Sequence, residues 1–317
     1  MSQPTQSQVH VDAILTAMSV AYLQARSNFL GTQAFGVIPV NKKADKYYKY
    51  AKDAFLRDEM KQRAPATESA GTGYGLSTDS YSCEPWALHK DVADEDRANS
   101  DSPLDPDADA VEFLTQKALL NLEISWVSAF FGTSKWSTDH TPGVLWSTPA
   151  TSDPIADVRT GKKTVLSNTG FEPNTLILGY EVYNILCEHP DLVDRIKYTS
   201  SDAVTPQIMA RLFDVERVMV ARAVKATAEE GAGSQTYGFA HGKHALLAYV
   251  KPNPGIRSVT AGATFMWRGI SEGLGETISV SRWREQRLRA DRLEVNQAYV
   301  HKVIAPDLGY FFNGAVA

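Results

Sequence analysis

Residues 41–104 limit the possible folds of this chain more than any other part of its sequence. The segment is rich in Tyr, Lys, Gly and Ser, and it shows little of the apolar spacing that a buried helix needs. Apolar and polar residues partly alternate between positions 74 and 90, which predicts a hairpin of long strands. A segment of this length without its own core does not suit a compact monomer. We therefore expect a neighbouring chain to supply the surface on which it packs.

Charge is unevenly distributed in and after this segment. Residues 41–65 contain eight Lys/Arg and four acidic residues, whereas residues 91–109 contain eight acidic residues and a single Arg. The two blocks can dock neighbouring copies, bind each other within one chain, or form two solvated faces. The sequence leaves all three alternatives open.

A band of arginines occurs in RWREQRLRADR, residues 282–292. Side chains two positions apart on a strand share a face, so the band can contact phosphate groups or the acidic block of a neighbour. We favour subunit contacts, because Glu285 and Asp291 interrupt the band and the chain has a net charge of −5, unlike a dedicated nucleic-acid binder. The candidate inter-subunit contacts are Lys42, Lys43, Lys46, Arg57, Arg63, Asp94, Glu95, Asp96, Arg282, Arg284, Arg287 and Arg289.

The clearest secondary-structure prediction is a helix over residues 107–131. Acidic residues crowd its start, apolar residues recur at helical spacing, and Gly132 follows its end. At 1.5 Å per residue, such a helix spans roughly 37 Å. Together with the strands, it indicates a mixed α+β class. The other expected elements are a helix from Asp12 to Gly31, buried strands at 217–226 and 244–252, and long antiparallel strands within 277–305.

Residues 174–199 have the order strand, glycine, helix, with which many nucleotide sites begin. A dinucleotide site requires G-x-G-x-x-G, because the backbone must approach the pyrophosphate closely. Here Gly179 is followed by Tyr180 and Glu181, which would repel phosphate, and the sequence contains no GxxxxGK[ST] motif. We expect a packing unit without a cofactor.

Other chemical motifs are equally incomplete. The acids of 105–109 lack the Gly and Glu of a calcium loop and are better explained as helix-start residues. His241 and His244 have no third ligand nearby, and nothing next to Cys83 marks it as an activated thiol. The sequence has no GxSxG motif, and Cys187 lies too far from Cys83 in the sequence to indicate a disulfide framework. We expect no catalytic, cofactor-binding or metal-binding residues.

Targeting signals are absent from the sequence. The N-terminus lacks the basic and apolar regions of a secretory signal, and no run approaches the roughly 20 apolar residues of a membrane span. Two isolated cysteines suit a reducing compartment. We expect synthesis in the cytoplasm and no membrane partner.

The order and spacing of several stretches make the chain resemble the major capsid proteins of tailed bacteriophages, which have the Hong Kong 97-like fold. The resemblance extends over nearly the whole chain, and no single stretch in it is a catalytic motif. The stretches are RDEMKQRAPATESAGTGYGLSTDSYSCEPWAL, DEDRANSDSPLDPDADAVEFLTQKALLNLE, PNTLILGYEVYNILCEHPDLVDRIKY and RADRLEVNQAYVHKVIAPDLGYFF.

This resemblance implies four structural parts. The hairpin would reach over the adjacent subunit, and the axial domain would pack around five- and six-fold axes. The implied parts are an N-terminal arm (1–40), an extended loop hairpin (41–104), a peripheral domain (105–149 and 276–302) with the spine helix 107–131, and an axial domain (150–275 and 303–317).

The resemblance also implies a structural role and not an enzyme. Pentamers and hexamers would form an icosahedral head that encloses double-stranded DNA and expands during maturation. The implied partners are further copies of the chain, a portal protein, a separate scaffolding protein, a decoration protein, and packaged DNA bound without sequence specificity. We expect assembly in the host cytoplasm, residence in the virion, and no cleaved N-terminal segment, and we assign no covalent crosslink.

Two rival functions are retained. An encapsulin-like compartment shares the fold but encloses an enzyme cargo, and the contents of native particles separate it from a phage head. A soluble α/β hydrolase requires a convergent pocket of titratable residues, which the sequence does not display.

Overall fold

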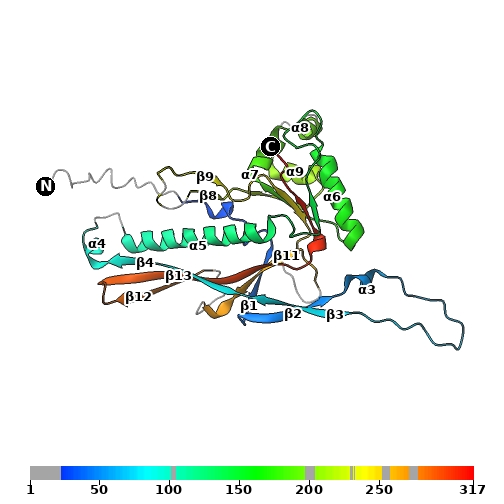
Figure 1. Cartoon of the computed structure of the whole chain (residues 1–317), viewed down its shortest axis with the longest axis horizontal. Helices are drawn as coiled ribbons and strands as arrows, with labels where there is room; N and C mark the ends of the chain where they lie inside the picture. The colour runs from blue at the N-terminus through cyan, green and yellow to red at the C-terminus, as the bar shows by residue number, and fades with distance from the viewer. Residues whose placement is uncertain are drawn as a thin grey trace.

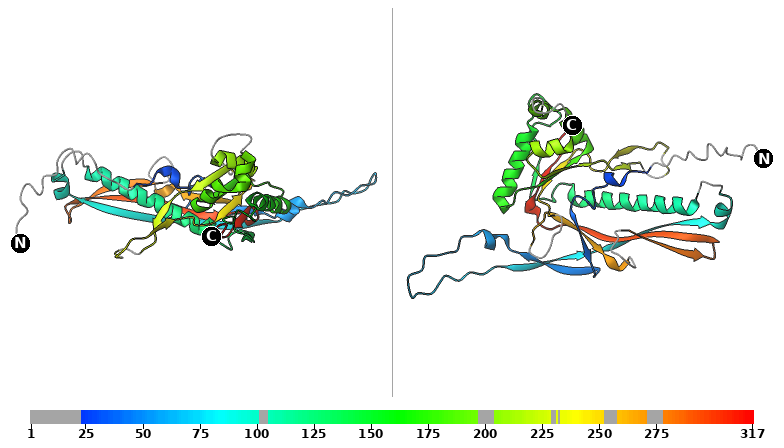
Figure 2. Two further views of the ribbon diagram at one scale, coloured as in Figure 1. Left: turned by 90° about the horizontal axis from the view of Figure 1, so that it is seen from above. Right: turned by 180° about the vertical axis from the view of Figure 1, so that it is seen from behind.

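The chain forms a long, flat molecule. In the computed structural model, α5 and the longest strands run along the molecular axis, and a second sheet with its helices stands at one end (Figure 1). A view from above shows how thin the molecule is (Figure 2). The structure describes residues 23–100, 105–196, 204–228, 231, 233–251, 258–270 and 278–317.

The first sheet is built around β13 (Ala290–Val303). Its N-terminal half lies between β12 (Ser279–Glu285) and β4 (Glu84–Ala93), both antiparallel to it. Its C-terminal half pairs with β11 (Gly262–Trp267), and β1 (Gly36–Val40) adds to β11 in parallel. One long strand therefore joins β4, β11 and β12, which lie far apart in the sequence.

α5 (Pro106–Phe130) lies along this sheet and confirms the predicted long helix. Asp105 caps it, because its carboxylate accepts hydrogen bonds from the backbone N–H groups of Asp107 (3.0 Å) and Ala108 (3.3 Å). One side of the helix carries a stripe of buried apolar side chains. Each large apolar side chain stabilises a fold by about 1.5–3 kcal/mol when it is buried, so packing holds the helix in place. The buried stripe is Ala110, Leu114, Ala118, Leu122, Trp126 and Phe130.

The second sheet has three short, fully buried central strands. β10 (Ala245–Ala248) is antiparallel to both β6 (Thr175–Gly179) and β14 (Gly309–Phe312). β7 (Arg217–Ala221) and β5 (Thr138–His140) complete the two edges in parallel. The buried strand predicted at 244–252 is confirmed by β10. The stretch 217–226 forms two strands, β7 and β8, which are mostly half-buried and not buried as predicted, and β8 lies in a separate sheet.

Helices cover the second sheet and pack closely on it. On α6 (Pro154–Thr169), a Cβ at Gly161 would lie 3.1 Å from Tyr310 and 3.3 Å from Leu247, so this helix approaches the sheet more closely than most side chains allow. The C-terminal half of α5 joins the same core through Trp126 and Phe130. The remaining helices of this part are α7 (Tyr180–Glu188), α8 (Pro190–Ile196) and α9 (Pro206–Leu212).

The strand–glycine–helix unit, which the structure describes over residues 174–196, is a packing unit. A Cβ at Gly179 would lie 2.1 Å from the carbonyl oxygen of Gly242, so the glycine admits another part of the backbone. In a dinucleotide site, the backbone at this glycine would face the phosphate. Here the turn at Gly242 occupies that side of Gly179.

The extended hairpin is formed by β2 (Ala44–Tyr50) and β3 (Leu76–Ser82), with α3 (Lys52–Leu56) following β2. The sequence predicted a hairpin within 74–90, and that pairing is wrong. β3 pairs with β2, whereas the next strand, β4, pairs with β13, so the chain changes partners at Cys83.

Smaller elements complete the described chain. The helix predicted from Asp12 lies mostly outside the described residues, and its last part is only the short η1 (Arg26–Asn28). The other small elements are α4 (Asp94–Ala98), β8 (Val224–Ala226), β9 (Tyr237–Phe239), η2 (Arg268–Ile270) and η3 (Pro306–Leu308).

Candidate subunit-interface surfaces

The candidate charged residues divide into two groups. Some have a partner in the same chain: Lys42 pairs with Asp45 at 3.0 Å, and Arg57 approaches Asp53 and Glu59 at 3.4 Å. Arg282, Arg284 and Asp94 also pair within the chain. Within the part of the chain that the structure describes, the candidates without an ion pair are Lys43, Lys46, Arg63, Glu95, Asp96, Arg287 and Arg289.

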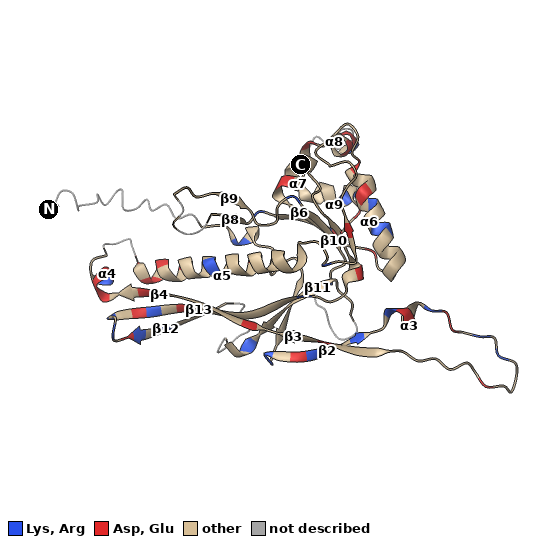
Figure 3. Cartoon of the chain, viewed as in Figure 1, with Lys and Arg blue, Asp and Glu red and all other residues tan. Residues whose placement is uncertain are grey.

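The two charge blocks do not bind each other within the described chain. The basic block lies on and beyond β2, whereas the acidic block lies at the far end of the long sheet, around α4 (Figure 3). The intrachain pairing of the blocks, one of the alternatives that the sequence left open, is therefore wrong for the described residues.

Three of the five arginines in the band, Arg282, Arg284 and Arg292, instead pair with acids of their own chain. Arg284 donates to the Asp94 carboxylate at 2.6 Å, and Arg292 donates to both oxygens of Asp91 at 2.6 and 2.8 Å. These hydrogen bonds lower the pKa of Asp94 and of Asp91 below the usual range. From the sequence, we expected the acidic partners of these arginines on a neighbouring subunit, and for Arg284 and Arg292 this expectation is wrong. The strands β12 and β4 both pair with β13, so the arginines and their acidic partners face each other within one subunit.

Further ion pairs tie the start of α5 into the same cluster. Arg97 donates to Asp107 at 2.7 Å and lies 3.2 Å from Asp291. Arg282 pairs with Asp291 and lies 3.4 Å from Asp107. A network of this kind holds side chains in place better than an isolated surface pair does.

The hairpin β2–β3 extends away from the two cores and exposes apolar side chains. Met60 is 93% exposed, Phe55 66% and Leu56 58%. At the root of the hairpin, Asp79 accepts from Lys302 at 3.0 Å and from the Tyr47 hydroxyl at 2.9 Å. The root is therefore attached to the long sheet, while the distal part has apolar surface without a covering layer.

A polar network joins α5 to the long sheet. The Ser125 hydroxyl lies 3.1 Å from Nε2 of His301, whose Nδ1 lies 2.9 Å from the Thr264 hydroxyl. Burial lowers the pKa of His301 to about 4, so the ring is neutral at neutral pH. An open groove of about 610 Å³ runs beside this network, between the C-terminal half of α5 and the start of β4. Both ring nitrogens already have partners, so the groove offers no free base.

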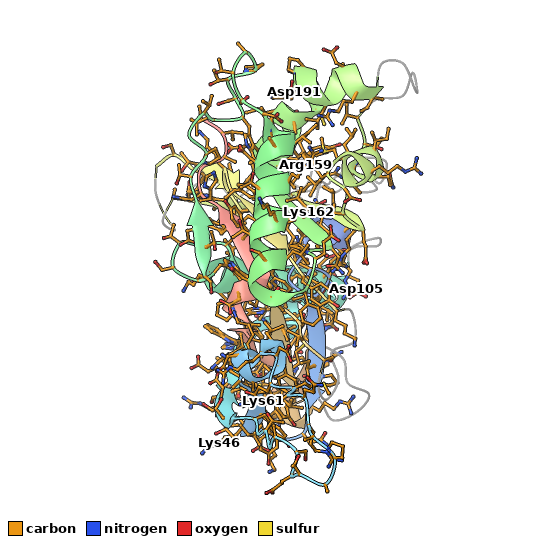
Figure 4. The ribbon with its side chains drawn as sticks, turned by 90° about the vertical axis from the view of Figure 1, so that its right-hand side faces the viewer. Lys46, Lys61, Asp105, Arg159, Lys162 and Asp191 are labelled. Atoms are coloured by element: carbon orange, nitrogen blue, oxygen red, sulfur yellow. The ribbon has the colours of Figure 1, made fainter. Side chains whose placement is uncertain are left out.

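One arrangement in the second part resembles a nucleophilic triad. The Ser152 hydroxyl lies 2.9 Å from Nε2 of His189, and Nδ1 of His189 lies 3.7 Å from the carboxylate of Asp191, which is labelled in Figure 4. However, the backbone N–H of Asp191 donates to Nδ1 at 3.3 Å, so the ring proton is on Nε2 and points at the serine. The serine hydroxyl in turn donates to the Thr148 carbonyl oxygen at 2.8 Å. A catalytic base must accept the serine proton, and this histidine donates instead.

A pocket of about 310 Å³ beside α6 contains a lysine whose charge is already paired. Lys162 donates to the carboxylates of Asp214 at 2.7 Å and Glu172 at 2.8 Å, and also to the Asp214 carbonyl oxygen. Figure 4 shows Lys162 and Arg159 on the outer helix α6. All three ammonium protons have acceptors, so the amine is not a free nucleophile.

The remaining motif residues also have structural roles. His244 accepts from the Gly314 N–H at 2.9 Å, whereas His241 faces Glu123, so the two histidines do not converge. Burial raises the pKa of the Cys83 thiol to about 11, the opposite of activation. Among the described residues, no group of three or more His, Cys, Asp or Glu side chains is placed to hold a metal ion.

Comparison with known proteins finds sequence relatives among phage major capsid proteins. No family model matches the chain. The major capsid protein of Pseudomonas phage JBD67 is 26% identical to it, and the alignment covers 97% of each chain. The chain is thus similar to a phage major capsid protein over nearly its whole length. A second relative, the major capsid protein of Burkholderia phage BcepMu, is 25% identical over 68% of this chain and 70% of its own length.

Solved structures show that this major capsid protein has the Hong Kong 97-like fold. A phage-related protein from Bordetella bronchiseptica RB50 is 25% identical, with a TM-score of 0.69 over 96% of this chain and 97% of that one. The subunit of the mature capsid of bacteriophage PhiM1 matches with a TM-score of 0.64 at 11% identity, covering 96% of this chain and 92% of that one. An encapsulin from Synechococcus elongatus PCC 7942 shares the fold at a TM-score of 0.52 and 11% identity, over 96% and 95% of the chains. The sequence relatives, both phage proteins, favour the phage capsid over the compartment.

As a phage major capsid protein, the chain is a component of the virion. No helix in the described ranges combines the length and apolar character needed to cross a bilayer.

Proposed function

We propose that this major capsid protein forms pentamers and hexamers of an icosahedral head that encloses double-stranded DNA, and that it has no catalytic role. The observation that carries the proposal is the hairpin β2–β3, which extends from the body with Phe55, Leu56 and Met60 exposed. Apolar side chains gathered on a projecting segment favour a protein partner. A neighbouring copy of the same chain would supply that partner in every position of a closed shell.

The proposed domain assignment follows the two sheets and moves two expected boundaries. β11 belongs with the long sheet, although the sequence placed it in the axial part, and β5 belongs with the second sheet, although the sequence placed it in the peripheral part. We assign the long sheet with α5 to the peripheral domain, the second sheet to the axial domain around the symmetry axes, and residues before β1 to the arm.

Expansion of the shell is part of the proposal. α5 contributes Leu114 and Ala118 to the core of the long sheet, and Trp126 and Phe130 to the core of the second sheet. A bend in this helix would therefore change the angle between the two domains. The part of the hairpin beyond α3 is the second element that we expect to swing, because the ion pair between Lys52 and Asp307 at 2.6 Å ties the start of α3 to the body.

The proposed partners, besides further copies of the chain, are a portal protein, a separate scaffolding protein, a decoration protein, and the packaged DNA. DNA contact would be non-specific and salt-dependent, as contacts to phosphate groups are. Arg282, Arg284 and Arg292 of the arginine band are already paired with acids in the same chain and are not expected to contribute to it.

Electron microscopy of the purified protein, with and without co-expressed neighbouring phage genes, tests the proposal. Closed shells or capsomer rings are expected, and double-stranded DNA is expected inside native particles. Monomers or dimers under all conditions would contradict the shell. Native shells filled with an enzyme and free of DNA would support the encapsulin-like alternative instead.

A further inference from the structure

The far end of the long sheet forms a single charged tip. Its two parts are α4 and the turn of residues 286–289 between β12 and β13. They lie side by side, because the backbone N–H of Asp94 donates to the carbonyl oxygen of Arg289 at 3.1 Å. Figure 3 shows the charges of both parts at the end of the long sheet that lies away from the hairpin.

The tip is held in one arrangement by its internal ion pairs. Arg284 bridges β12 to Asp94 on α4, and Arg97 of α4 reaches Asp107 at the start of α5. Arg282 and Asp291 connect the two strands. These ion pairs hold α4 and the turn in fixed positions, so the charged side chains of the tip that are not in ion pairs also start from fixed backbone positions.

Charges of both signs remain unpaired on this frame. Glu95 and Asp96 are exposed on α4, and Arg287 and Arg289 are exposed on the turn; within the described ranges, none of them makes an ion pair. Between the two arginines, Leu288 is 55% exposed. An apolar side chain flanked by free arginines, next to free acids, is a surface complementary to itself.

The backbone of the turn provides a second, independent observation. Arg289 has φ of +47°, in the left-handed region that favours glycine or asparagine. Hairpin turns usually place those residues at such a position. Strained conformations of this kind cluster at binding and functional sites.

We propose that the tip binds the tip of a second copy of this chain, with Arg287 and Arg289 of one copy against Glu95 and Asp96 of the next and Leu288 between them. The inference rests on the proposed shell function and specifies one of its contacts. Because each tip carries both halves of the contact, a closed ring of tips pairs every one of these charges. A nucleic acid does not fit here, because the two acids would repel phosphate.

Charge reversal with rescue tests this contact. The variants are Arg287→Glu with Arg289→Glu, Glu95→Lys with Asp96→Lys, and all four changes together. Each pair of reversals places like charges opposite one another and should lower the yield of closed shells at least about tenfold. The fourfold variant restores both complementarity and net charge and should regain most of that yield. The conservative pair Arg287→Lys with Arg289→Lys keeps the charge and should assemble.

Shells are counted by electron microscopy and sedimentation, and thermal melting of unassembled subunits checks that each variant folds. Both paired reversals assembling at wild-type yield would overturn the tip contact and leave the shell function intact. A fourfold variant as defective as the paired reversals would also overturn the proposed pairing. A wild-type protein that forms no shells would overturn the shell function, and the tip contact with it.

Discussion

The Glu123 carboxylate lies 3.4 Å from Nε2 of His241, and both side chains are fully buried. The second carboxylate oxygen accepts from the Gly31 N–H at 2.7 Å. Burial raises the pKa of Glu123 to about 7 and lowers the pKa of His241 to about 3. The pair therefore joins the arm, the long helix and the turn at residues 240–242 without a stable charge at mildly acidic pH.

Glu123→Gln should remove a pH dependence from the stability of the subunit. The folded-state pKa of Glu123 lies above its ordinary value of 4.5, so its neutral form stabilises the fold fully below pH 4.5, and this contribution is lost as pH rises through about 7. A glutamine keeps an acceptor for Gly31 and stays neutral. The free energy of unfolding, measured in urea on unassembled subunits, should therefore change differently with pH in the two proteins. Between pH 4.5 and pH 8.5, the value for the variant should rise relative to that of the wild type by on the order of 3 kcal/mol.

His241 provides an internal check in that experiment. Its folded-state pKa is lowered, so its contribution is present above pH 6.5 and is lost as pH falls toward about 3, in both proteins. Glu112→Gln, at an exposed position of the same helix, is the matched control and should not change with pH in this way. A constant stability difference between Glu123→Gln and the wild type at all pH values would show that Glu123 is ionised in the fold.

The pair of Glu123 and His241 has little local signal in the sequence. Glu123 directly follows Leu122 of the buried stripe of α5. The available signal was that Leu119 and Val127, four positions to either side, are apolar, so the glutamate interrupts a second apolar stripe. His241 lies on a turn 118 positions later, and no local pattern connects the two residues.

Gly31→Ala should destabilise the same junction through packing. A Cβ there would lie 2.3 Å from Cδ2 of Leu122 and 3.2 Å from the Glu123 carboxylate. Overpacking of this kind costs about 1–3 kcal/mol. Gly143→Ala is the control, because a Cβ there meets no atom within 4 Å, and it should be neutral or stabilise by up to about 1 kcal/mol. Equal midpoints of urea unfolding for the two variants would mean that the turn at Gly31 can shift away from Leu122 and Glu123 without loss of stability.

Helices and strands that a local sequence pattern marks were predicted well. Which strands pair with one another was not predicted, because pairing depends on distant segments. The periodicity and capping acids of 107–131 identified α5 to within one residue at each end. Strand pairing depends on segments far apart in the sequence, so alternation within 74–90 suggested a local hairpin. In the structure, the Cys83 N–H donates to the carbonyl oxygen of Lys43, and the chain then leaves β2 for β13. The charged residues show the same limit, because their positions could be read from the sequence but their partners depended on register.

Changing Lys42, Lys43 and Lys46 together to glutamate should impair assembly and leave the subunit folded. The side chains of Lys43 and Lys46 make no ion pair within the described ranges, and Lys42 has only the nearby Asp45. Lys46 lies on β2 of the hairpin that we propose contacts a neighbour, and Lys42 and Lys43 directly precede this strand. Sedimentation should show at least about tenfold fewer shells, with circular dichroism unchanged. Changing the same three lysines to glutamine, which removes their charge without reversing it, is the control and should impair assembly less. Normal shells from the glutamate variant would show that these three lysines make no contact needed for assembly.

Arg289→Asn should make the subunit more stable and the shell less complete. Asparagine tolerates the left-handed backbone at φ of +47°, so the change should stabilise the fold by up to about 1 kcal/mol. The same change removes a charge that we place in the tip contact, so fewer shells should form. Ser134→Asn is the matched control, because Ser134 has φ of +61° away from the tip and should gain stability without losing assembly. If Arg289→Asn gains stability and assembles like the wild type, the arginine has no role between subunits, and its strained backbone has no functional explanation.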